Sequence, residues 1–208
     1  MNPLVSVIVP TYNRTQLLIE RCLPSVFAQR VQDFEVLVVG DGTEQATVDA
    51  ISQIKDRRLF FWNLPHYPYP EDFADRWAIV GCPALNFGLD QARGKWIAVI
   101  ADDDEWTPDH HQVLLNAVGD ADHVYGLSDT YDHSGRLTGQ LYGESRVGEG
   151  AFCNGANLYR ASLGYRYDLA CRSRGRNGDE DLWLRMRDDG VRFQQVPQIV
   201  HHYYRNWP

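Results

Sequence analysis

The sequence predicts one α/β domain whose sheet is mixed but mainly parallel and is flanked by helices. Three short apolar runs rich in β-branched residues, typical of strands buried on both faces, lie at 4–10, 34–40 and 95–101. Stretches of helical character lie between them, at 14–29 and 44–55. Because strand and helix alternate, the first half of the chain is expected to form a Rossmann-like layer.

Proline, asparagine and aromatic residues modify this alternation. Pro24 lies inside the first helical stretch and is expected to kink it, because proline lacks the N–H that a helix interior requires. Asn13 precedes that stretch and is expected to be its N-cap. The segment 58–63 is strand-like and 84–92 is helical, whereas 62–77 is so rich in proline and aromatic residues that a loop is expected.

The second half of the chain is less regular, and fewer elements follow from its pattern. Residues 132–135 read Asp-His-Ser-Gly and predict a hairpin turn between two strands. A helix is expected from 180 to 189, with Gly190 in the position that commonly closes a helix. The segment 191–204 is then strand-like.

Two pairs of adjacent histidines differ in their expected surroundings. His110 and His111 are expected on the solvated side of a helix that starts near Thr107. His201 and His202 lie in a strand-like segment, so their side chains should point to opposite faces. At most one of that pair should therefore reach a functional site.

Composition limits the class of protein. Hydrophobic residues make up 44% and charged residues 23% of the chain, which is ordinary for a folded domain, and a single domain over 1–208 is expected. The net charge of −8 argues against a nucleic-acid partner, because sequence-independent binding needs a basic surface. No apolar run approaches the length of a membrane span, so any membrane contact should be peripheral.

The cysteines are widely separated and form no C-x-x-C pair, which indicates neither a zinc site nor a disulfide framework. This pattern fits a reducing compartment, and a cytoplasmic location is expected. The four are Cys22, Cys82, Cys153 and Cys171.

Polar residues follow each predicted core strand, where ligands of open α/β sheets bind. These segments are Pro-Thr-Tyr-Asn at 10–13, Gly-Asp-Gly-Thr at 40–43 and three aspartates at 102–104. Both glycine-rich nucleotide cradles, G-x-G-x-x-G and G-x-x-x-x-G-K-[ST], are missing, so a bound diphosphate would need a metal ion to neutralise it. The alternative for the aspartates is a solvated loop at the start of a helix.

Together these segments resemble the nucleotide-sugar-dependent glycosyltransferases of family 2, which have the GT-A fold. The resemblance rests on four motifs in the same order, namely VSVIVPTYNR, VVGDGT, NFGLDQARGKWIAVIADDDEWTPD and NGDEDLWLRM. It covers most of the first 120 residues and returns at 178–186. It implies a nucleotide-sugar-binding half at 1–120 and an acceptor-binding half at 121–208.

The resemblance implies an enzyme that moves a sugar from a nucleoside-diphosphate donor to a hydroxyl of a glycan or another acceptor, with inversion at the sugar carbon. UDP-sugars are the favoured donors. The tyrosine-bearing first loop and the aspartate after the second strand would bind the base, and the D-x-D region would bind the ribose and a metal ion on the diphosphate. The residues assigned to donor binding are Pro10, Thr11, Tyr12, Arg14, Asp41, Asn86, Asp102 and Asp103.

The implied cofactor is Mn²⁺ or Mg²⁺. Asp103 is expected as its ligand, with Asp104 in reserve and His202 from the late strand, while Asp102 is expected to contact the ribose or a metal-bound water. Both metals prefer oxygen ligands, and one or two carboxylates suffice when substrate phosphates complete the coordination. The metal would stabilise the charge on the departing diphosphate.

The catalytic base is expected among Asp179, Glu180 and Asp181. The resemblance points to Asp179, which lies two residues before the aspartate of an Asp-Leu-x-Leu-Arg stretch. Helix geometry agrees, because at about 100° per residue Asp179 shares the apolar side of Leu182 whereas Asp181 falls nearly opposite. Such a carboxylate would take the proton of the acceptor hydroxyl. The alternative is that Asp179 only caps the helix.

Two other classes of function remain open. A metal-dependent phosphohydrolase would combine the three aspartates with His110 and His202, but it would need ligands from several strands. A non-catalytic nucleotide-sugar-binding domain is conceivable because Gly40 and Ala101 stand where many family members have aspartate.

Overall fold

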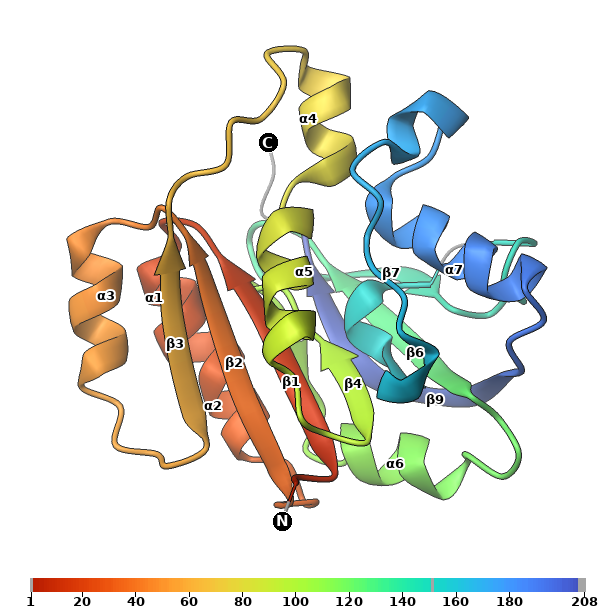
Figure 1. Ribbon diagram of the computed structural model, residues 1–208. Coiled ribbons are helices and arrows are strands. Elements are labelled where there is room, and N and C mark those ends of the chain that lie inside the picture. The colour runs from red at the N-terminus through yellow and green to blue at the C-terminus, as the bar shows by residue number, and fades with distance from the viewer. Residues whose placement is uncertain (1, 151, 206–208) are drawn as a thin grey trace.

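Figure 1 shows the computed structural model of the chain, which describes residues 2–150 and 152–205. Within these residues a nine-stranded sheet has the order β3-β2-β1-β4-β8-β6-β9-β5, and β7 pairs with β6. The strands are β1 (Val5–Thr11), β2 (Phe34–Asp41), β3 (Leu59–Leu64), β4 (Trp96–Val99), β5 (Glu105–Trp106), β6 (His123–Tyr131), β7 (Leu137–Tyr142), β8 (Asn157–Arg160) and β9 (Phe193–Tyr204).

The helices lie between and after these strands. They are α1 (Thr15–Leu17), the π-helical turn η1 (Leu18–Cys22), α2 (Leu23–Phe27), α3 (Gln45–Ser52), α4 (Phe73–Ile79), α5 (Cys82–Gln91), α6 (His110–Asn116), the 3₁₀ turns η2 (Asn154–Ala156), η3 (Ala161–Leu163) and η4 (Cys171–Arg174), and α7 (Gly178–Asp188). No helix in the described part of the chain is long and apolar enough to cross a membrane.

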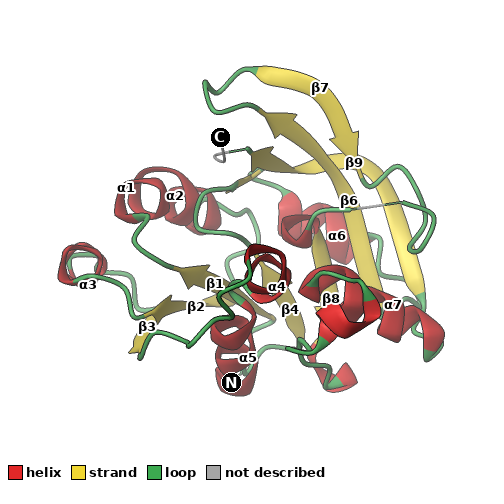
Figure 2. Cartoon of the chain, turned by 90° about the horizontal axis from the view of Figure 1, so that it is seen from above, coloured by secondary structure: helices red, strands yellow, loops and turns green. Residues whose placement is uncertain are grey.

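Strands β3, β2, β1 and β4 run parallel to one another, as the apolar runs predict. Every residue of β2 and β4 is buried, so both faces of this part of the sheet are covered. Figure 2 shows α1 and α2 on one side of these strands and α5 on the other. The α/β prediction is therefore confirmed, and so is the Rossmann-like arrangement of the first half.

The second half makes the sheet mixed, as predicted. Strand β8 joins β4 and β6 in antiparallel pairings, while β9 pairs parallel with β6 and antiparallel with β5. The hairpin predicted at 132–135 connects β6 to β7, and Asp132 Oδ1 accepts hydrogen bonds from Ser134 N at 2.9 Å and Arg136 N at 3.0 Å. Gly190 follows α7 with a φ of 83°, the left-handed conformation that commonly ends a helix.

Two segments of the first half, the helical stretch 14–29 and the aromatic segment 62–77, contain irregular structure. The first helical stretch is interrupted as expected, because the π-helical turn η1 comes directly before the turn that contains Pro24. The expectation of a loop over 62–77 is wrong at both ends, since β3 continues to Leu64 and α4 starts at Phe73. Asp72 caps α4 by accepting a hydrogen bond from Asp75 N at 2.9 Å, a local signal that the aromatic composition obscured.

The expectation that His110 and His111 face solvent is wrong, because both side chains are fully buried. His110 stacks on Trp106 with 4.2 Å between ring centroids, and its Nε2 lies 3.1 Å from Gly155 O. Strand β5 and the turn η2 thus cover the side of α6 that carries the histidines. Burial lowers the pKa of His111 to about 3 and that of His110 well below its usual value, so both rings are neutral at pH 7.

A buried carboxylate ties β2 to its neighbours at the end of the sheet away from the polar loops. Glu35 is 2% exposed, and its Oε1 accepts from Ser6 Oγ at 2.7 Å and from Arg93 N at 2.8 Å. Its Oε2 accepts from Arg93 Nε at 2.9 Å. The carboxylate therefore connects β1, β2 and the turn before β4.

Replacement of this carboxylate by an amide should destabilise the protein. Glu35→Gln would turn an NH₂ group toward the donors of Arg93, so we expect the free energy of unfolding to fall by about 1–2 kcal/mol, the lower part of the range for charged hydrogen bonds because Arg93 is half exposed. Urea denaturation measures this change. The exposed Glu71→Gln is the matched control and should shift stability by less than about 0.5 kcal/mol. Equal shifts would contradict a specific role for the Glu35 network.

Candidate functional site

The loops that follow β1, β2 and β4 meet at one edge of the sheet, as parallel strands require (Figure 1). Thr11 Oγ1 donates to Asp102 Oδ2 at 2.7 Å, and Tyr12 N donates to the same oxygen at 3.3 Å. Asn13 Oδ1 accepts from Glu44 N at 2.8 Å and so links the first loop to the second. The N-cap role expected for Asn13 is wrong, because this residue has a left-handed φ of 52° and bridges two loops instead.

Asp102, Asp103 and Asp104, called the acid cluster below, are buried at this edge with exposed fractions of 4–5%. The alternative of a solvated acidic loop is therefore wrong. Burial raises the pKa of Asp102 to about 6, although the nearby Arg14 opposes the rise. The cluster thus carries negative charge that its surroundings compensate incompletely.

Two arginines from the segment after β1 contact the acid cluster. Arg14 Nη1 lies 2.5 Å from Asp103 Oδ2 and 3.3 Å from Asp102 Oδ1, so one guanidinium bridges both carboxylates. Arg21 Nη1 donates to Asp103 O at 2.9 Å and therefore holds the backbone of the cluster. A cation already lies where the first two carboxylates face each other.

Strand β9 supplies the partners of the third aspartate. Tyr204 N donates to Asp104 Oδ1 at 2.9 Å, and the buried His201 places its Nε2 3.2 Å from Asp104 Oδ2. His202 lies on the other face of the strand, where its Nδ1 is 3.0 Å from the hydroxyl of Tyr131. The two histidines do point to opposite faces, but the one beside the acid cluster is His201 and not His202, since strand alternation turns the latter away.

The fit of this site to a metal ion depends on its donor set. In residues 2–150 and 152–205 no group of three or more His, Cys, Asp or Glu side chains is arranged to hold a metal ion. The facing carboxylates of Asp102 and Asp103 remain as oxygen donors that already accept a cation, the Arg14 guanidinium. Such a pair suits Mg²⁺ or Mn²⁺ when substrate phosphates supply further ligands. The phosphohydrolase alternative loses support because it needs protein ligands from several strands.

An aromatic segment covers the loop after β2. Asp41 is buried, and its Oδ1 accepts from Tyr67 N at 2.7 Å. A further hydrogen bond joins Asp41 to the hydroxyl of Tyr69, and burial together with this bond raises the pKa of that tyrosine. His66 stacks on Tyr12 with 5.0 Å between ring centroids. The proposed base-binding residues Tyr12 and Asp41 are therefore adjacent, and both contact this segment.

The start of α7 faces the same region as the acid cluster. Burial raises the pKa of Cys153 to about 12, and the carboxylates of Asp104 and Asp179 both add to the rise. A Cβ atom at Gly178 would lie 2.5 Å from Cys82 Sγ, and one at the neighbouring Gly81 would lie 3.8 Å from Pro10 Cβ, so the start of α7 lies beside the end of β1. Asp179 itself is partly buried, and this burial raises its pKa.

The three acidic residues of α7 have different surroundings. Asp181 is fully buried and accepts from Arg174 Nε and Arg185 Nε, each at 2.7 Å, so the expectation that it faces away from the protein is wrong. The reason is that the arginine-bearing turn η4 covers that side of the helix. Burial would raise the pKa of Asp181, but the hydrogen bonds from these arginines outweigh it, and the pKa lies below its usual value. Glu180 is exposed.

Some residues that the sequence assigned to donor binding instead contact other parts of the fold. Asn86 donates to Tyr167 O at 2.9 Å and accepts from Tyr167 N at 2.8 Å, so it anchors the segment before η4. Pro10 is partly buried beside Gly81, since a Cβ atom placed on Gly81 would lie 3.8 Å from Pro10 Cβ. The roles of His201 and His66 were not identified from the sequence. Strand alternation allowed either histidine of the 201–202 pair, and His66 lies in no motif.

The model of the family described as Glycosyl transferase family 2 matches residues 6–168. Similar curated proteins include a GalNAc(5)-diNAcBac-PP-undecaprenol beta-1,3-glucosyltransferase of Campylobacter jejuni, 30% identical over 128 residues, and the putative colanic acid biosynthesis glycosyl transferase WcaA of Escherichia coli, 33% identical over 114 residues. The matches cover 60% and 55% of this chain but 38% and 37% of those proteins. The matched region is thus well under half of each relative.

Solved structures share the fold at low sequence identity. S. aureus TarS 1-349 in complex with UDP has a TM-score of 0.73 at 17% identity, covering 98% of this chain and 60% of that one. The mannosyltransferase PcManGT from Pyrobaculum calidifontis, in complex with GDP-Man and Mn²⁺, has a TM-score of 0.69 at 16% identity, covering 97% and 57%. Likeness at this level establishes the fold, and the GT-A prediction is confirmed.

Neutralising Asp102 should stabilise the protein at neutral pH. Its pKa of about 6 lies above the ordinary value of 3.8, so the folded state binds more protons between these values and loses stability as the pH rises through that window. Asp102→Asn removes this loss, and we expect it to unfold with a free energy higher by about 2 kcal/mol above pH 7. Urea denaturation of the parent and of Asp102→Asn at a series of pH values measures the difference.

The advantage of Asp102→Asn should shrink as the pH falls from about 6 to about 4 and should vanish below that, where the carboxyl becomes protonated in the unfolded state as well. The exposed Asp120→Asn serves as the control and should show no such trend. A variant that is less stable than the parent at every pH would mean that the Asp102 charge is fully compensated by Arg14.

Proposed function

The chain belongs to glycosyl transferase family 2, and from this we propose that it transfers a sugar from a UDP-sugar to a hydroxyl group of a glycan, with a divalent metal ion and with inversion at the sugar carbon. The observation that supports the proposal is that the acid cluster, the Tyr12 and Asp41 loops and the start of α7 lie at the same edge of the sheet. A donor with its base at the loops and its diphosphate at the acid cluster would direct its sugar toward Asp179.

The base of the donor would bind at Tyr12 and Asp41. Half of the Tyr12 side chain is exposed, which leaves an aromatic surface for a nucleobase. The carbonyl and carboxylate of Asp41 are hydrogen-bond acceptors, so they would select a base with a ring N–H, such as the imide of uracil. The UDP complex of TarS supports a uridine donor, whereas the GDP-Man complex of PcManGT supports a guanosine donor as the alternative.

The diphosphate would bind at the acid cluster. Asp103 and Asp102 are the residues that would hold Mn²⁺ or Mg²⁺ together with the donor phosphates, and the bound ion would stabilise charge on the leaving diphosphate. The Mn²⁺ complex of PcManGT supports this cofactor. Arg14 contacts both carboxylates and can donate to phosphate oxygens from the same position. Asp104 is engaged by His201 and Tyr204 N, so we assign it to holding the loop in place.

Asp179 would act as the catalytic base. Its raised pKa indicates a carboxylate without a strong cationic partner, which keeps it able to accept a proton. Asp181 is a poor candidate because two arginines stabilise its charged form. Attack by the deprotonated acceptor hydroxyl on the sugar carbon, opposite to the leaving diphosphate, inverts the anomeric centre.

The acceptor would bind between the second half of the chain and the acid cluster. We assign donor binding to residues 1–120 and acceptor binding to 121–208 of a single domain. The names of the Campylobacter jejuni and Escherichia coli relatives, which refer to a lipid-linked glycan and to colanic acid, support a glycan acceptor. All four cysteines are free thiols, which supports a reducing compartment such as the cytoplasm.

Binding of UDP should depend on a divalent metal and on Asp103. Calorimetry with Mn²⁺ should show UDP binding that is lost in EDTA, because a metal is needed between two groups of negative charge. Asp103→Ala should weaken UDP binding by about tenfold or more while leaving uridine unchanged, since uridine has no phosphate. The exposed Asp120→Ala should behave like the parent. Equal UDP affinity in Mn²⁺ and in EDTA would contradict metal dependence.

Removal of the Asp179 carboxylate should abolish most of the transfer. Asp179→Asn keeps the shape and much of any capping, so donor affinity should persist while kcat falls by about 10²-fold or more, as expected for a lost general base. Transfer to a panel of glycan acceptors, measured by UDP release, provides the rate. The parent rate should rise with pH through a pKa above the usual carboxyl range, because burial raises the pKa of Asp179.

Two neighbours of Asp179 provide the controls. Glu180→Gln alters an exposed carboxylate in the same turn and should change kcat little. Asp181→Asn should lower stability, since it removes the charge between Arg174 and Arg185, and its rate must be compared at a temperature where it remains folded. Full activity of Asp179→Asn together with an inactive, folded Asp181→Asn would transfer the role to Asp181.

A further inference from the structure

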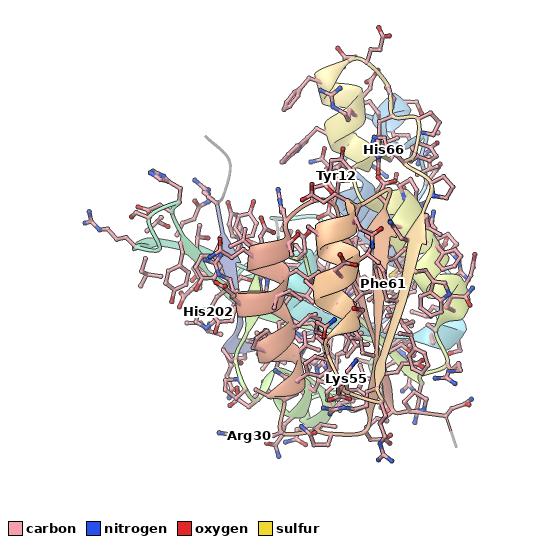
Figure 3. The ribbon with its side chains drawn as sticks, turned by 90° about the vertical axis from the view of Figure 1, so that its left-hand side faces the viewer. Tyr12, Arg30, Lys55, Phe61, His66 and His202 are labelled. Atoms are coloured by element: carbon pink, nitrogen blue, oxygen red, sulfur yellow. The ribbon has the colours of Figure 1, made fainter. Side chains whose placement is uncertain are left out.

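His66 contacts Tyr12, Asp41 and Tyr69 at the base side of the site, and its ring centroid lies 5.6 Å from that of Tyr69. Its ring lies on Tyr12 with 5.0 Å between centroids and 25° between planes, and Figure 3 labels the two residues next to each other, below the yellow helix α4. Its Nδ1 lies 3.1 Å from Asp41 O and 3.6 Å from Asp41 Oδ2. Because a carbonyl oxygen can only accept, Nδ1 carries the proton in this contact.

These are the contacts that the proposed function assigns to the nucleobase, namely a flat ring stacked on Tyr12 and a ring N–H directed at Asp41. We propose that the imidazole of His66 occupies the base subsite before the donor binds and makes the contacts that the nucleobase would make. The imidazole rotates out of the subsite when a nucleoside diphosphate enters. The inference rests on the proposed function, because it takes Tyr12 and Asp41 as the base-binding residues. It identifies the ligand class as a base with a ring N–H.

The residues around His66 determine the position of its side chain. Gly42 has a φ of 67°, and a Cβ atom there would lie 2.6 Å from His66 Cβ, so only glycine permits this close approach. Asp41 meanwhile holds the rest of the segment through Tyr67 N and the hydroxyl of Tyr69. These bonds do not involve the imidazole and can remain while it rotates.

Rotation of one side chain is therefore sufficient to open the subsite. The side chain of His66 is 52% exposed, so solvent lies on one side of the ring and no packed core has to move. The stack on Tyr12, the ring contact with Tyr69 and the hydrogen bond favour the inward position only weakly, because half of the side chain remains exposed to solvent. The inward position would then be populated about fivefold over the outward one, and every ligand that uses the subsite loses affinity by about that factor.

Removal of the imidazole should therefore strengthen nucleotide binding. Calorimetry in Mn²⁺ should show that His66→Ala binds UDP about fivefold more tightly than the parent. CDP affinity should rise by the same factor, since the gain comes from the ligand-free state and leaves the ratio of the two affinities unchanged. Inorganic diphosphate does not reach the base subsite and should bind the parent and His66→Ala equally.

Two variants control for side effects of the substitution. His66→Phe keeps a ring that can lie on Tyr12, so it should show no gain in UDP affinity. His133→Ala changes an exposed histidine in the β6–β7 turn and should bind UDP like the parent. A gain in His66→Ala without a gain in His66→Phe attributes the effect to the ring that occupies the subsite.

Unchanged or weaker UDP binding by His66→Ala overturns the inference. Weaker UDP binding together with an altered ratio of UDP to CDP affinity would show that His66 contacts the bound base. In either case metal-dependent UDP binding by the parent leaves the proposed function standing. If neither the parent nor any of these variants binds UDP or GDP in Mn²⁺, the proposed function fails and the inference fails with it.

Discussion

Three consecutive carboxylates buried at one edge of the sheet constrain the rest of this structure. Like charges repel strongly where water is excluded, so hydrogen-bond donors and cations must come from elsewhere in the chain. Arg14 bridges the first two carboxylates, and Tyr204 N and His201 engage the third. The loop after β1 and the end of β9 are consequently held at the same place, although nearly the whole sequence lies between them.

The end of the last strand thereby becomes part of a site formed mainly by the first half. Strand β5 follows the acid cluster directly and pairs with β9, which brings the two together. Tyr204 strengthens the junction, since its hydroxyl donates to Glu105 Oε2 at 3.1 Å and the guanidinium of Arg21 lies 3.7 Å from its ring centre. The acid cluster is thus clamped between the two halves, so a change in either half can alter its position.

The first turn of α7 shows how surroundings separate residues of one chemical type. Burial raises the pKa of Asp179, whereas two arginines lower that of Asp181 despite its deeper burial. Glu180 between them faces solvent. A proton acceptor needs a carboxylate that no cation neutralises, and this requirement favours Asp179, the residue that the motif spacing also points to, over Asp181.

The sequence by itself determined the parallel core strands and the edge at which their polar ends meet, because burial on both faces and strand-end polarity are patterns within short segments. It also determined the positions of the acid cluster and of Asp179. Only the tertiary structure decided which histidine accompanies the acid cluster, that Asp181 is buried among arginines, and that His66 lies on Tyr12. Each of these depends on a partner far along the chain, and local periodicity contains no information about which distant donor will satisfy a buried charge.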